Sequence, residues 1–343
     1  MNCSRFALSE LAQIKYGKNQ SKVENPNGKY PIYGTGGLMS YTDEFLYDKP
    51  SVLIGRKGTI GKVRYMETPF WTVDTLFYTV VNDEIINPKY LYYKLSQIDL
   101  NEYNEGTTIP SLRTDTLNRI ELDIQDRDTQ ERIVKIISPI ENKIASNNRT
   151  NDNLYSIGET LFKEKIDSNS YAEKRKLRSF FPVVTGKKDA NAATEDGKYP
   201  FFTCSRQISR INDYTFDSSA ILLAGNGDFN VKFYRGKFDA YQRTYVLIPE
   251  DKLLLGYLYW AISIKLSDIT SNFRGSVIRF ITKGNIEDYE VAYLPDPRIL
   301  NQFQSYLEMI EANNLENERL TKLRDTLLPE LLNGKIDISN IDI

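Results

Sequence analysis

The residues of this chain best suited to binding chemistry form a short cationic, glycine-rich segment. Its basic residues, with no Asp or Glu among them, are Lys49, Arg56, Lys57, Lys62 and Arg64. The glycines of residues 55–62 let the backbone approach a ligand closely, and backbone N–H groups and cations bind phosphate oxygens. We therefore predict that this loop, including Thr59, contacts nucleic acid. A solvated β-turn is the alternative interpretation.

The same loop does not fit the nucleotide-binding pattern GxxxxGK[ST]. Arg56 stands where the first glycine would be needed, and Val63 stands in place of Ser or Thr. We therefore expect contact with a nucleic-acid backbone, and no bound nucleotide.

A second segment, residues 225–232, resembles the first but carries other side chains. It keeps glycines and Lys232, and it replaces the Arg-Lys pair with Asn226, Gly227 and Asp228. Asn230 lies in the same loop. Arg pairs with guanine and Asn with adenine in the major groove, so we expect two unlike half-sites. Weaker candidates, for each of which a plain surface residue is the alternative, are Arg113, Gln242, Arg243, Arg274 and Arg279.

The composition removes most enzyme chemistry. Histidine is absent, which excludes His-based triads and HExxH metal sites. Cys3 and Cys204 have no second cysteine at metal-ligand spacing, so we expect two reduced thiols. The net charge of −2 gives no global basic signature, so charge has to be considered locally.

Two enzyme classes that act on DNA also lack their motifs. The string closest to a methyltransferase (Asn/Asp)-Pro-Pro-aromatic motif is Asn-Pro-Lys-Tyr at residues 87–90, which lacks the second proline. We see no clustered acidic motif of a nuclease. We therefore predict no catalytic residue, metal or cofactor in this chain.

Nothing in the sequence indicates a membrane. Residues 1–16 lack the apolar core of a signal peptide. The most apolar run, residues 253–264, is shorter than the roughly 20 residues that cross a bilayer. We expect a cytoplasmic protein.

Two long helices are predicted to position these loops. Apolar residues recur in steps of three and four over residues 133–162, and again over residues 303–331. The first stripe consists of Ile133, Ile137, Ile140, Ile144, Leu154, Ile157 and Leu161, and the second of Phe303, Leu307, Ile310, Leu320, Leu323, Leu327 and Leu331. The two stretches match residue by residue at a shift of 166, which indicates a duplicated helix.

The rest of the chain repeats as well. Four blocks recur in the same order at shifts of 167 to 169: 28–31 with 197–200, 51–55 with 220–224, 90–93 with 257–260, and 106–109 with 275–278. Each unit therefore consists of a globular part with short strands, followed by one long helix. Aromatic residues at 90–93 and 257–260 are predicted to pack in a core, although stacking on bases is the alternative.

The helix ends carry local signals. Asp128 with Glu131 can cap the central helix, and Pro139 should kink it or delay its regular part. Asn333 and Gly334 supply a stop for the C-terminal helix.

The expected fold class is α+β. It has two similar globular domains, each a small twisted sheet with helices, separated by two long helices that form an antiparallel, pseudo-twofold coiled coil. We predict domains at 1–127 and 167–296, helices at 128–166 and 297–334, and a tail at 335–343. Antiparallel pairing at this shift sets Asn147 opposite Asn317 and Asn151 opposite Asn313, a polar layer that fixes the register. A structural coiled coil without nucleic acid is the alternative.

At these residues the chain closely resembles the specificity subunits of type I restriction–modification systems. The resemblance covers nearly the whole chain, and it depends on the order of the motifs, twice over, more than on any single one. The motifs are the lead segments 8–14 and 30–34 and the blocks 52–62, 106–117, 130–133 and 327–336, the last ending in Leu-Leu-Asn-Gly-Lys-Ile.

The resemblance implies a non-catalytic subunit that binds a bipartite, asymmetric site on double-stranded DNA. Each target recognition domain would read one half, and the helices would set the unread spacer. It also implies docking of methyltransferase subunits, and of restriction/translocase subunits through them, with S-adenosylmethionine, ATP and Mg²⁺ used by those partners. A coiled-coil adaptor that binds only proteins is the competing class, and the salt dependence of binding separates the two.

Overall fold

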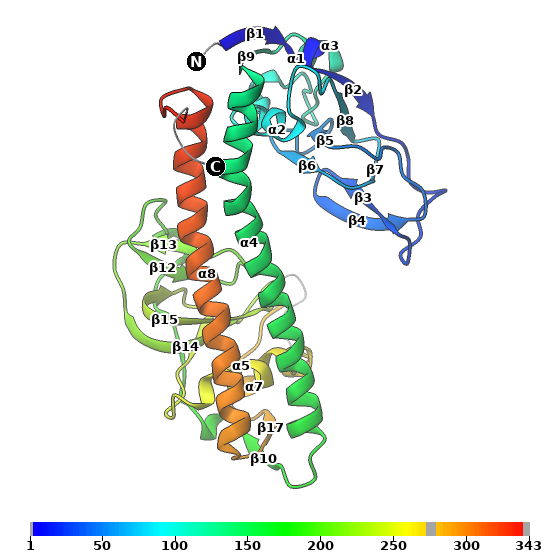
Figure 1. Cartoon of the computed structure of the whole chain (residues 1–343). Coiled ribbons are helices and arrows are strands. Elements are labelled where there is room, and N and C mark those ends of the chain that lie inside the picture. Colours follow the sequence, from blue (N-terminus) through cyan, green and yellow to red (C-terminus); the bar gives the residue numbers. More distant parts are fainter. Residues whose placement is uncertain (1–2, 272–278, 339–343) are drawn as a thin grey trace. The chain divides into compact units, whose positions relative to one another are not determined.

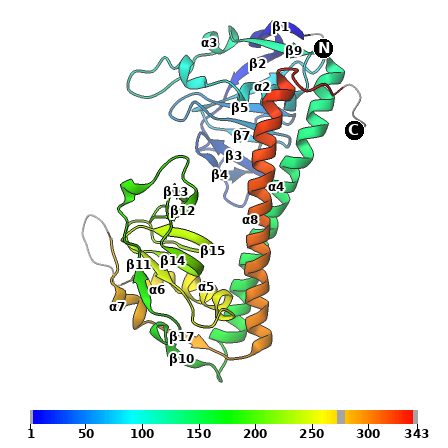
Figure 2. The same ribbon diagram turned by 90° about the vertical axis from the view of Figure 1, so that its left-hand side faces the viewer.

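A computed structural model describes residues 3–271 and 279–338 of the chain (Figures 1 and 2). The chain divides into two compact units. Unit 1 consists of Met1–Ile144 and Glu318–Ile343, and unit 2 of Ala145–Asn317. Each unit therefore combines a globular part with segments of both long helices, α4 (Arg127–Phe162) and α8 (Pro297–Leu332).

Unit 1 contains three sheets. The four-stranded sheet has the order β2 (Ala12–Tyr16), β8 (Leu76–Val81), β5 (Ser51–Gly55) and β6 (Val63–Met66). The three-stranded sheet has the order β4 (Gly37–Thr42), β3 (Tyr30–Gly34) and β7 (Trp71–Thr72). A separate antiparallel pair joins β1 (Cys3–Ala7) to β9 (Glu121–Gln125).

Unit 2 contains a six-stranded sheet and a pair. The sheet has the order β11 (Val183–Thr185), β16 (Thr244–Leu247), β14 (Phe216–Ala224), β15 (Val231–Ala240), β12 (Tyr199–Phe202) and β13 (Ser209–Ile211). The pair joins β10 (Glu173–Lys176) to β17 (Glu290–Tyr293).

The two units share one topology, because the strands of unit 1 map onto those of unit 2 in the same order. The parallel pairing of β3 with β7 recurs as that of β12 with β15. The long strand β15 corresponds to β6 and β7 together. Pro69 lies between β6 and β7, and because proline has no N–H for a ladder it divides the strand and hence the sheet.

Short helices cover the sheets. The longer ones are α2 (Pro88–Ser96) and α5 (Leu254–Ile264), and the side chain of Asn87 caps α2 by accepting from two backbone N–H groups. The others are α1 (Leu8–Leu11), α3 (Thr114–Asn118), α6 (Leu266–Thr270) and α7 (Lys283–Glu287), with 3₁₀ turns at Leu100–Tyr103, Leu177–Ser179 and Ala190–Ala192.

The aromatic residues of α2 and α5 lie in the cores, as predicted. Tyr90 and Tyr93 are fully buried in unit 1, and Tyr257 and Trp260 are buried in unit 2. Each of these four side chains donates a hydrogen bond. Tyr257 Oη, for example, donates to the carbonyl of Ala292 at 2.6 Å. They therefore stabilise the units and are not available for stacking on bases.

The two long helices are α4 (Arg127–Phe162) and α8 (Pro297–Leu332), each of 36 residues. A π-helical turn, Lys163–Asp167, extends α4. In unit 2 the helices are antiparallel: Asn147 contacts Asn317, and the rings of Phe162 and Phe303 lie 6.4 Å apart. Among the described residues, no helix combines the length and apolar character needed to span a membrane.

In unit 1, the first turns of α4 share a core with the last turns of α8. Ile133 and Ile137 lie in one buried cluster with Leu328 and Leu331. The beginning of one helix thus packs with the end of the other, as antiparallel pairing requires. This fold of two similar sheet-containing units with two long paired helices confirms the predicted fold class.

A polar layer joins α4 and α8 within unit 2. Asn147 Nδ2 donates to Asn317 Oδ1 at 2.9 Å, and Asn313 Nδ2 donates to Asn151 Oδ1 at 2.8 Å. Asn147 and Asn151 are only 4% and 6% exposed. These are the pairs that the shift of 166 predicts, whereas the role of the layer in setting the register stays a prediction.

Part of the predicted apolar stripe does not face the helix partner. Ile157 and its equivalent Leu323 are 49% and 46% exposed. On α4 the buried line runs through Leu154, Gly158 and Phe162 in steps of four, so Ile157 lies to one side of it.

The helix starts and stops differ in detail from the expectations. Asp126, and not Asp128, accepts the Thr129 N–H at 3.0 Å, because α4 begins at Arg127 and places Asp126 just before the first turn. The α-helix is continuous through Pro139. At the other end, α8 stops as predicted, since Gly334 has φ +68° and the N–H of Lys335 reaches back to the carbonyl of Glu330.

Candidate nucleic-acid interface

In unit 1 the cationic loop follows β5 directly and is tightly built. A Cβ on Gly55 would lie 2.1 Å from the carbonyl oxygen of Thr59, so only glycine fits there. Gly58 has φ +85°, which glycine adopts without strain. The N–H of Arg56 donates to the carbonyl of Thr75 at 2.8 Å. The loop is therefore held in one shape.

A second loop supports the first, and sequence reasoning did not assign it this role. Gly58 N donates to the carbonyl of Pro110 at 2.9 Å, and Leu112 N donates to the carbonyl of Arg56 at 2.9 Å. Asn104 Oδ1 shapes this second loop by accepting the N–H groups of Gly106 and Ser111, each at 2.9 Å. The repeat of residues 106–109 at 275–278 was the available signal.

The basic side chains of the first loop contact carbonyl oxygens and a ring, or are exposed to solvent. Arg56 Nη1 donates to the carbonyl of Asp74 at 2.8 Å, and its guanidinium lies 5.1 Å from the ring centroid of Tyr16. Lys57 and Lys62 are exposed, and Arg64 is half-buried with Nη2 3.5 Å from the carbonyl oxygen of Thr35. Within the described ranges, none of these cations forms an ion pair with a carboxylate.

Two further candidates of unit 1 lie beside this loop. Thr59 is exposed at its tip. Arg113 is exposed as well, but its Nε lies 3.1 Å from a carboxylate oxygen of Glu105, so much of its charge is neutralised. Of these candidates, the residues of the first loop therefore carry the positive charge that no carboxylate neutralises within the described ranges.

Unit 2 builds the same pair of loops. Gly227 has φ +70°, and its N–H donates to the carbonyl of Arg279 at 2.9 Å. The N–H of Ile281 donates to the carbonyl of Gly225 at 3.0 Å. Each of these contacts has its counterpart in unit 1 at a shift of 169, so the backbone architecture is duplicated while the side chains differ.

Asn230 and Lys232 hold this loop from within. Asn230 is 6% exposed, and its Nδ2 donates to the carbonyls of Cys204 at 2.9 Å and Asp228 at 2.7 Å. Lys232 Nζ donates to Asn230 Oδ1, and burial lowers the pKa of Lys232. In this arrangement the Asn230 amide faces the protein and not a base edge.

The remaining predicted residues of unit 2 are more accessible. Gln242 and Arg243 are exposed beside a small cavity of about 330 Å³, and Arg279 is exposed on the second loop. Asn226 is half-buried and forms a β-bridge with Phe280. Arg274 lies outside the described residues.

One residue at this interface was missed from the sequence. Arg206, between β12 and β13, lies against Asp228 of the glycine-rich loop, with Nε 2.6 Å from Oδ2 and Nη2 3.2 Å from Oδ1. The corresponding hairpin turn in unit 1, residues 34–37, contains no charged residue, so comparison of the two repeats does not single out Arg206. Its position after the repeated block 197–200 was the only sequence signal.

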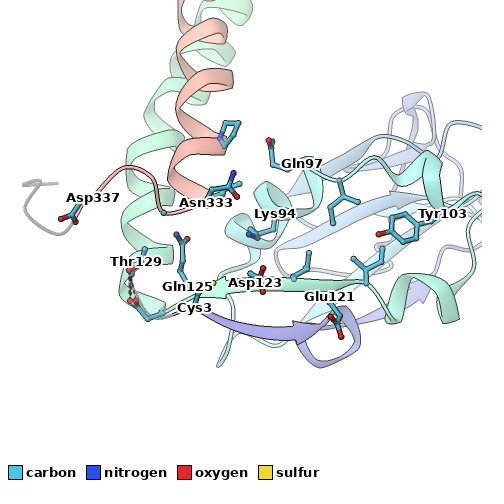
Figure 3. Close-up of a pocket in the computed structure, with 17 residues that line it drawn as sticks. Cys3, Lys94, Gln97, Tyr103, Glu121, Asp123, Gln125, Thr129, Asn333 and Asp337 are labelled. Carbon is cyan, nitrogen blue, oxygen red and sulfur yellow. Dashed lines mark hydrogen bonds between the residues drawn. The ribbon is translucent and has the colours of Figure 1, made fainter.

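A larger cavity lies elsewhere in unit 1, where the end of α8 meets the β1–β9 pair (Figure 3). It has a volume of about 1240 Å³. Glu121, Asp123 and Asp337 contribute carboxylates to its lining, and Lys94 is its basic residue, with a pKa lowered by burial. Asp126 also lines the cavity, so its charged residues are mostly acidic and do not suit a DNA backbone. Among the described residues, no group of three or more potential ligands is arranged to hold a metal ion.

Comparisons with known proteins agree with this picture of two equivalent units. The family model described as "Type I restriction modification DNA specificity domain" matches the chain twice, at residues 2–155 and 169–325. The two matches together span most of the chain.

Two curated relatives illustrate the range of similarity. The chain is 44% identical to the type I restriction enzyme EcoDI specificity subunit of Escherichia coli over 168 residues, which is 47% of this chain and only 37% of that relative. It is 31% identical to the HindI specificity subunit of Haemophilus influenzae over 377 residues, covering 78% of this chain and 81% of the relative.

A solved structure shares the fold. The S subunit of a type I restriction–modification system from M. genitalium superposes with a TM-score of 0.67 over 96% of both chains, at 19% sequence identity. This likeness extends over the globular parts and the long helices alike.

Proposed function

The chain belongs to the family of type I restriction–modification DNA specificity subunits, and we propose that it binds a bipartite, asymmetric site on double-stranded DNA, with one half-site per unit. The observation that carries this proposal is the duplicated loop pair. Each unit presents a glycine-rich loop fixed by a second loop, through the same backbone hydrogen bonds at a shift of 169. Such a platform positions side chains against a duplex without a large entropy loss on binding.

The side chains on the two platforms support an asymmetric target. Unit 1 presents Arg56, Lys57 and Lys62, which form no ion pair with a described residue, whereas the equivalent loop of unit 2 presents Asn226 and Asp228. Because Arg and Asn hydrogen-bond different base edges, the two platforms recognise different sequences.

The long helices are suited to set the spacer between half-sites. A helix of 36 residues is about 54 Å long, which exceeds the roughly 34–36 Å of one turn of B-DNA. The spacer is therefore a segment of duplex whose length, and not its sequence, is recognised.

The helices also offer surfaces for partner proteins. Ile157 and Met309 in unit 2, and Leu323 in unit 1, are each 46–49% exposed on α4 or α8. Ile157 and Leu323 occupy equivalent helix positions at the shift of 166, so the repeat carries an exposed apolar residue at the same place twice. We propose that methyltransferase subunits dock there, that restriction/translocase subunits join through them, and that these partners use S-adenosylmethionine, ATP and Mg²⁺. This chain supplies recognition and no catalytic group.

A binding selection on random duplexes tests the proposal. The full chain with its methyltransferase partner should select two unlike half-sites at a fixed separation. Its affinity should fall with salt, with a slope in log K against log[salt] of about −0.9 for each phosphate contacted. If the chain retains no duplex above background, or if salt does not change its binding, the proposal is wrong. The chain would then be a coiled-coil adaptor that binds only proteins.

A further inference from the structure

An arginine and an aspartate on neighbouring loops of unit 2 form an exposed pair at the candidate interface. The Arg206 and Asp228 side chains are 72% and 61% exposed, yet both carboxylate oxygens of Asp228 contact the guanidinium, at 2.6 and 3.2 Å. An exposed ion pair of this kind adds little to the stability of a protein, because solvent screens the two charges. Stability alone is therefore a weak reason for the arrangement.

The two loops that carry this pair are fixed to each other by one buried amide. Asn230 Nδ2 donates both to the carbonyl of Asp228 and to the carbonyl of Cys204, two residues before Arg206. The N–H of Ser205 also donates to Thr203 Oγ1 at 3.2 Å, which shapes the loop before Arg206. The direction of the Arg206 side chain is thus determined before any ligand arrives.

The geometry leaves a defined set of donors. A guanidinium has five N–H donors, and Asp228 takes Nε–H and one hydrogen of Nη2. Among the described residues, no other group contacts the end of the guanidinium, which carries the Nη1 hydrogens and the second Nη2 hydrogen. Two parallel donors at this end match the N7 and O6 acceptors of guanine in the major groove.

We propose that Arg206, held by Asp228, reads one guanine in the half-site bound by unit 2. This inference rests on the proposed function and adds a specificity-determining residue to it. Because the pair is close to neutral, it contributes discrimination between bases and little salt-dependent attraction. The equivalent positions in unit 1 are Gly37 and Thr59, so the contact belongs to the second half-site only.

The experiment begins with the selection above, which defines the second half-site for the full chain with its methyltransferase partner. Binding to this duplex is then measured for Arg206→Ala, Arg206→Lys and Asp228→Asn. The control is Arg178→Ala, which breaks the exposed pair of Arg178 with Asp288 elsewhere in unit 2.

Arg206→Ala should weaken binding to the selected duplex about 5- to 150-fold, the range of one bidentate base contact. Its preference at one G·C pair should disappear, while the preferences in the first half-site persist. Arg206→Lys should not restore the preference, because an ammonium lacks the paired donors. Asp228→Asn should lower the preference and make the salt slope steeper by about 0.9, since the arginine charge is no longer neutralised. Arg178→Ala should behave as the wild type.

Replacing that guanine by 7-deazaguanine removes the N7 acceptor and gives an independent check. The wild type should bind the modified duplex more weakly than the original one. The Arg206→Ala protein should bind the two duplexes with the same affinity. If the two losses add, or if Arg206→Ala weakens all duplexes equally or has no effect, the inference is wrong while the proposed function stands. If the wild type selects no sequence at all, both fail.

Discussion

Arg56 is held from two sides, by the carbonyl of Asp74 and by the ring of Tyr16, so its guanidinium has few ways to turn. Replacement by Ala should weaken binding by about 1–3 kcal/mol if it pairs with guanine. The loss should be confined to sequences that match the half-site of unit 1. Competition among duplexes that vary in one half-site at a time measures this.

Lys57 on the same loop provides the matched control. It is exposed, and no carboxylate contacts it within the described part of the chain. Lys57→Ala should therefore weaken binding to all sequences alike and reduce the salt slope by about 0.9, because one phosphate contact is lost. If Arg56→Ala gives the same uniform loss, Arg56 is a phosphate contact as well.

At the scale of elements, Gly158 shows how closely α4 packs on α5 in unit 2. A Cβ at this position would lie 2.1 Å from the Trp260 ring, which is itself 2% exposed. Gly158→Ala should lower the free energy of unfolding by about 1–3 kcal/mol through overpacking, although Ala is the better helix former.

Urea denaturation followed by circular dichroism measures the effect. Ser156→Ala, at an exposed position two residues before on the same helix, should change stability by less than about 0.5 kcal/mol. A Gly158→Ala protein more stable than the wild type would mean that the indole shifts easily and that the close contact is not required.

The asparagine layer between α4 and α8 in unit 2 yields a prediction about specificity of pairing. Replacing both Asn147 and Asn317 by Leu removes a part-buried polar contact and should raise the free energy of unfolding, because an apolar pair of similar size packs without desolvation cost. The two helices should then pair in more than one register.

Spin labels on α4 and α8 within unit 2 would report that register as a distance distribution. The distribution should be narrow in the wild type and broad or double in the Asn147→Leu, Asn317→Leu protein. A single replacement, Asn147→Ala, should instead destabilise by about 1–3 kcal/mol, since Glu316 and Asn317 each lose its Nδ2 donor. An unchanged, narrow distribution in the double variant would show that the apolar contacts alone set the register.

At the scale of the whole molecule, the length of the helices is expected to determine the DNA spacer. One heptad inserted into both α4 and α8 adds about 10 Å of helix, or about three base pairs of B-DNA. A binding selection with the lengthened protein should recover the same two half-sites with a longer separation.

An insertion into one helix only is the control for this prediction. It breaks the match between the two stripes and should abolish the fixed separation without creating a new one. If the doubly lengthened protein selects the original spacer, the length of the helices does not determine the spacer.

Much of the fold follows from local patterns. The repeat, the paired helices and the burial of Tyr90, Tyr93, Tyr257 and Trp260 were predictable, because apolar periodicity and β-rich runs bounded by glycine and proline act over short distances. The end of α8 was predictable for the same reason, since Gly334 alone supplies the left-handed residue that stops it.

What the sequence by itself determined is therefore the duplicated architecture and the location of the glycine-rich loops. Only the tertiary structure decided which side chains those loops present. Asn230 turns inward because two carbonyls from different loops, of Cys204 and Asp228, converge on its amide, and Arg206 gains its partner only when the hairpin meets the loop after β14. The contacts of Asn230 with Cys204 and of Arg206 with Asp228 join residues 26 and 22 positions apart in the sequence, and no local propensity encodes them.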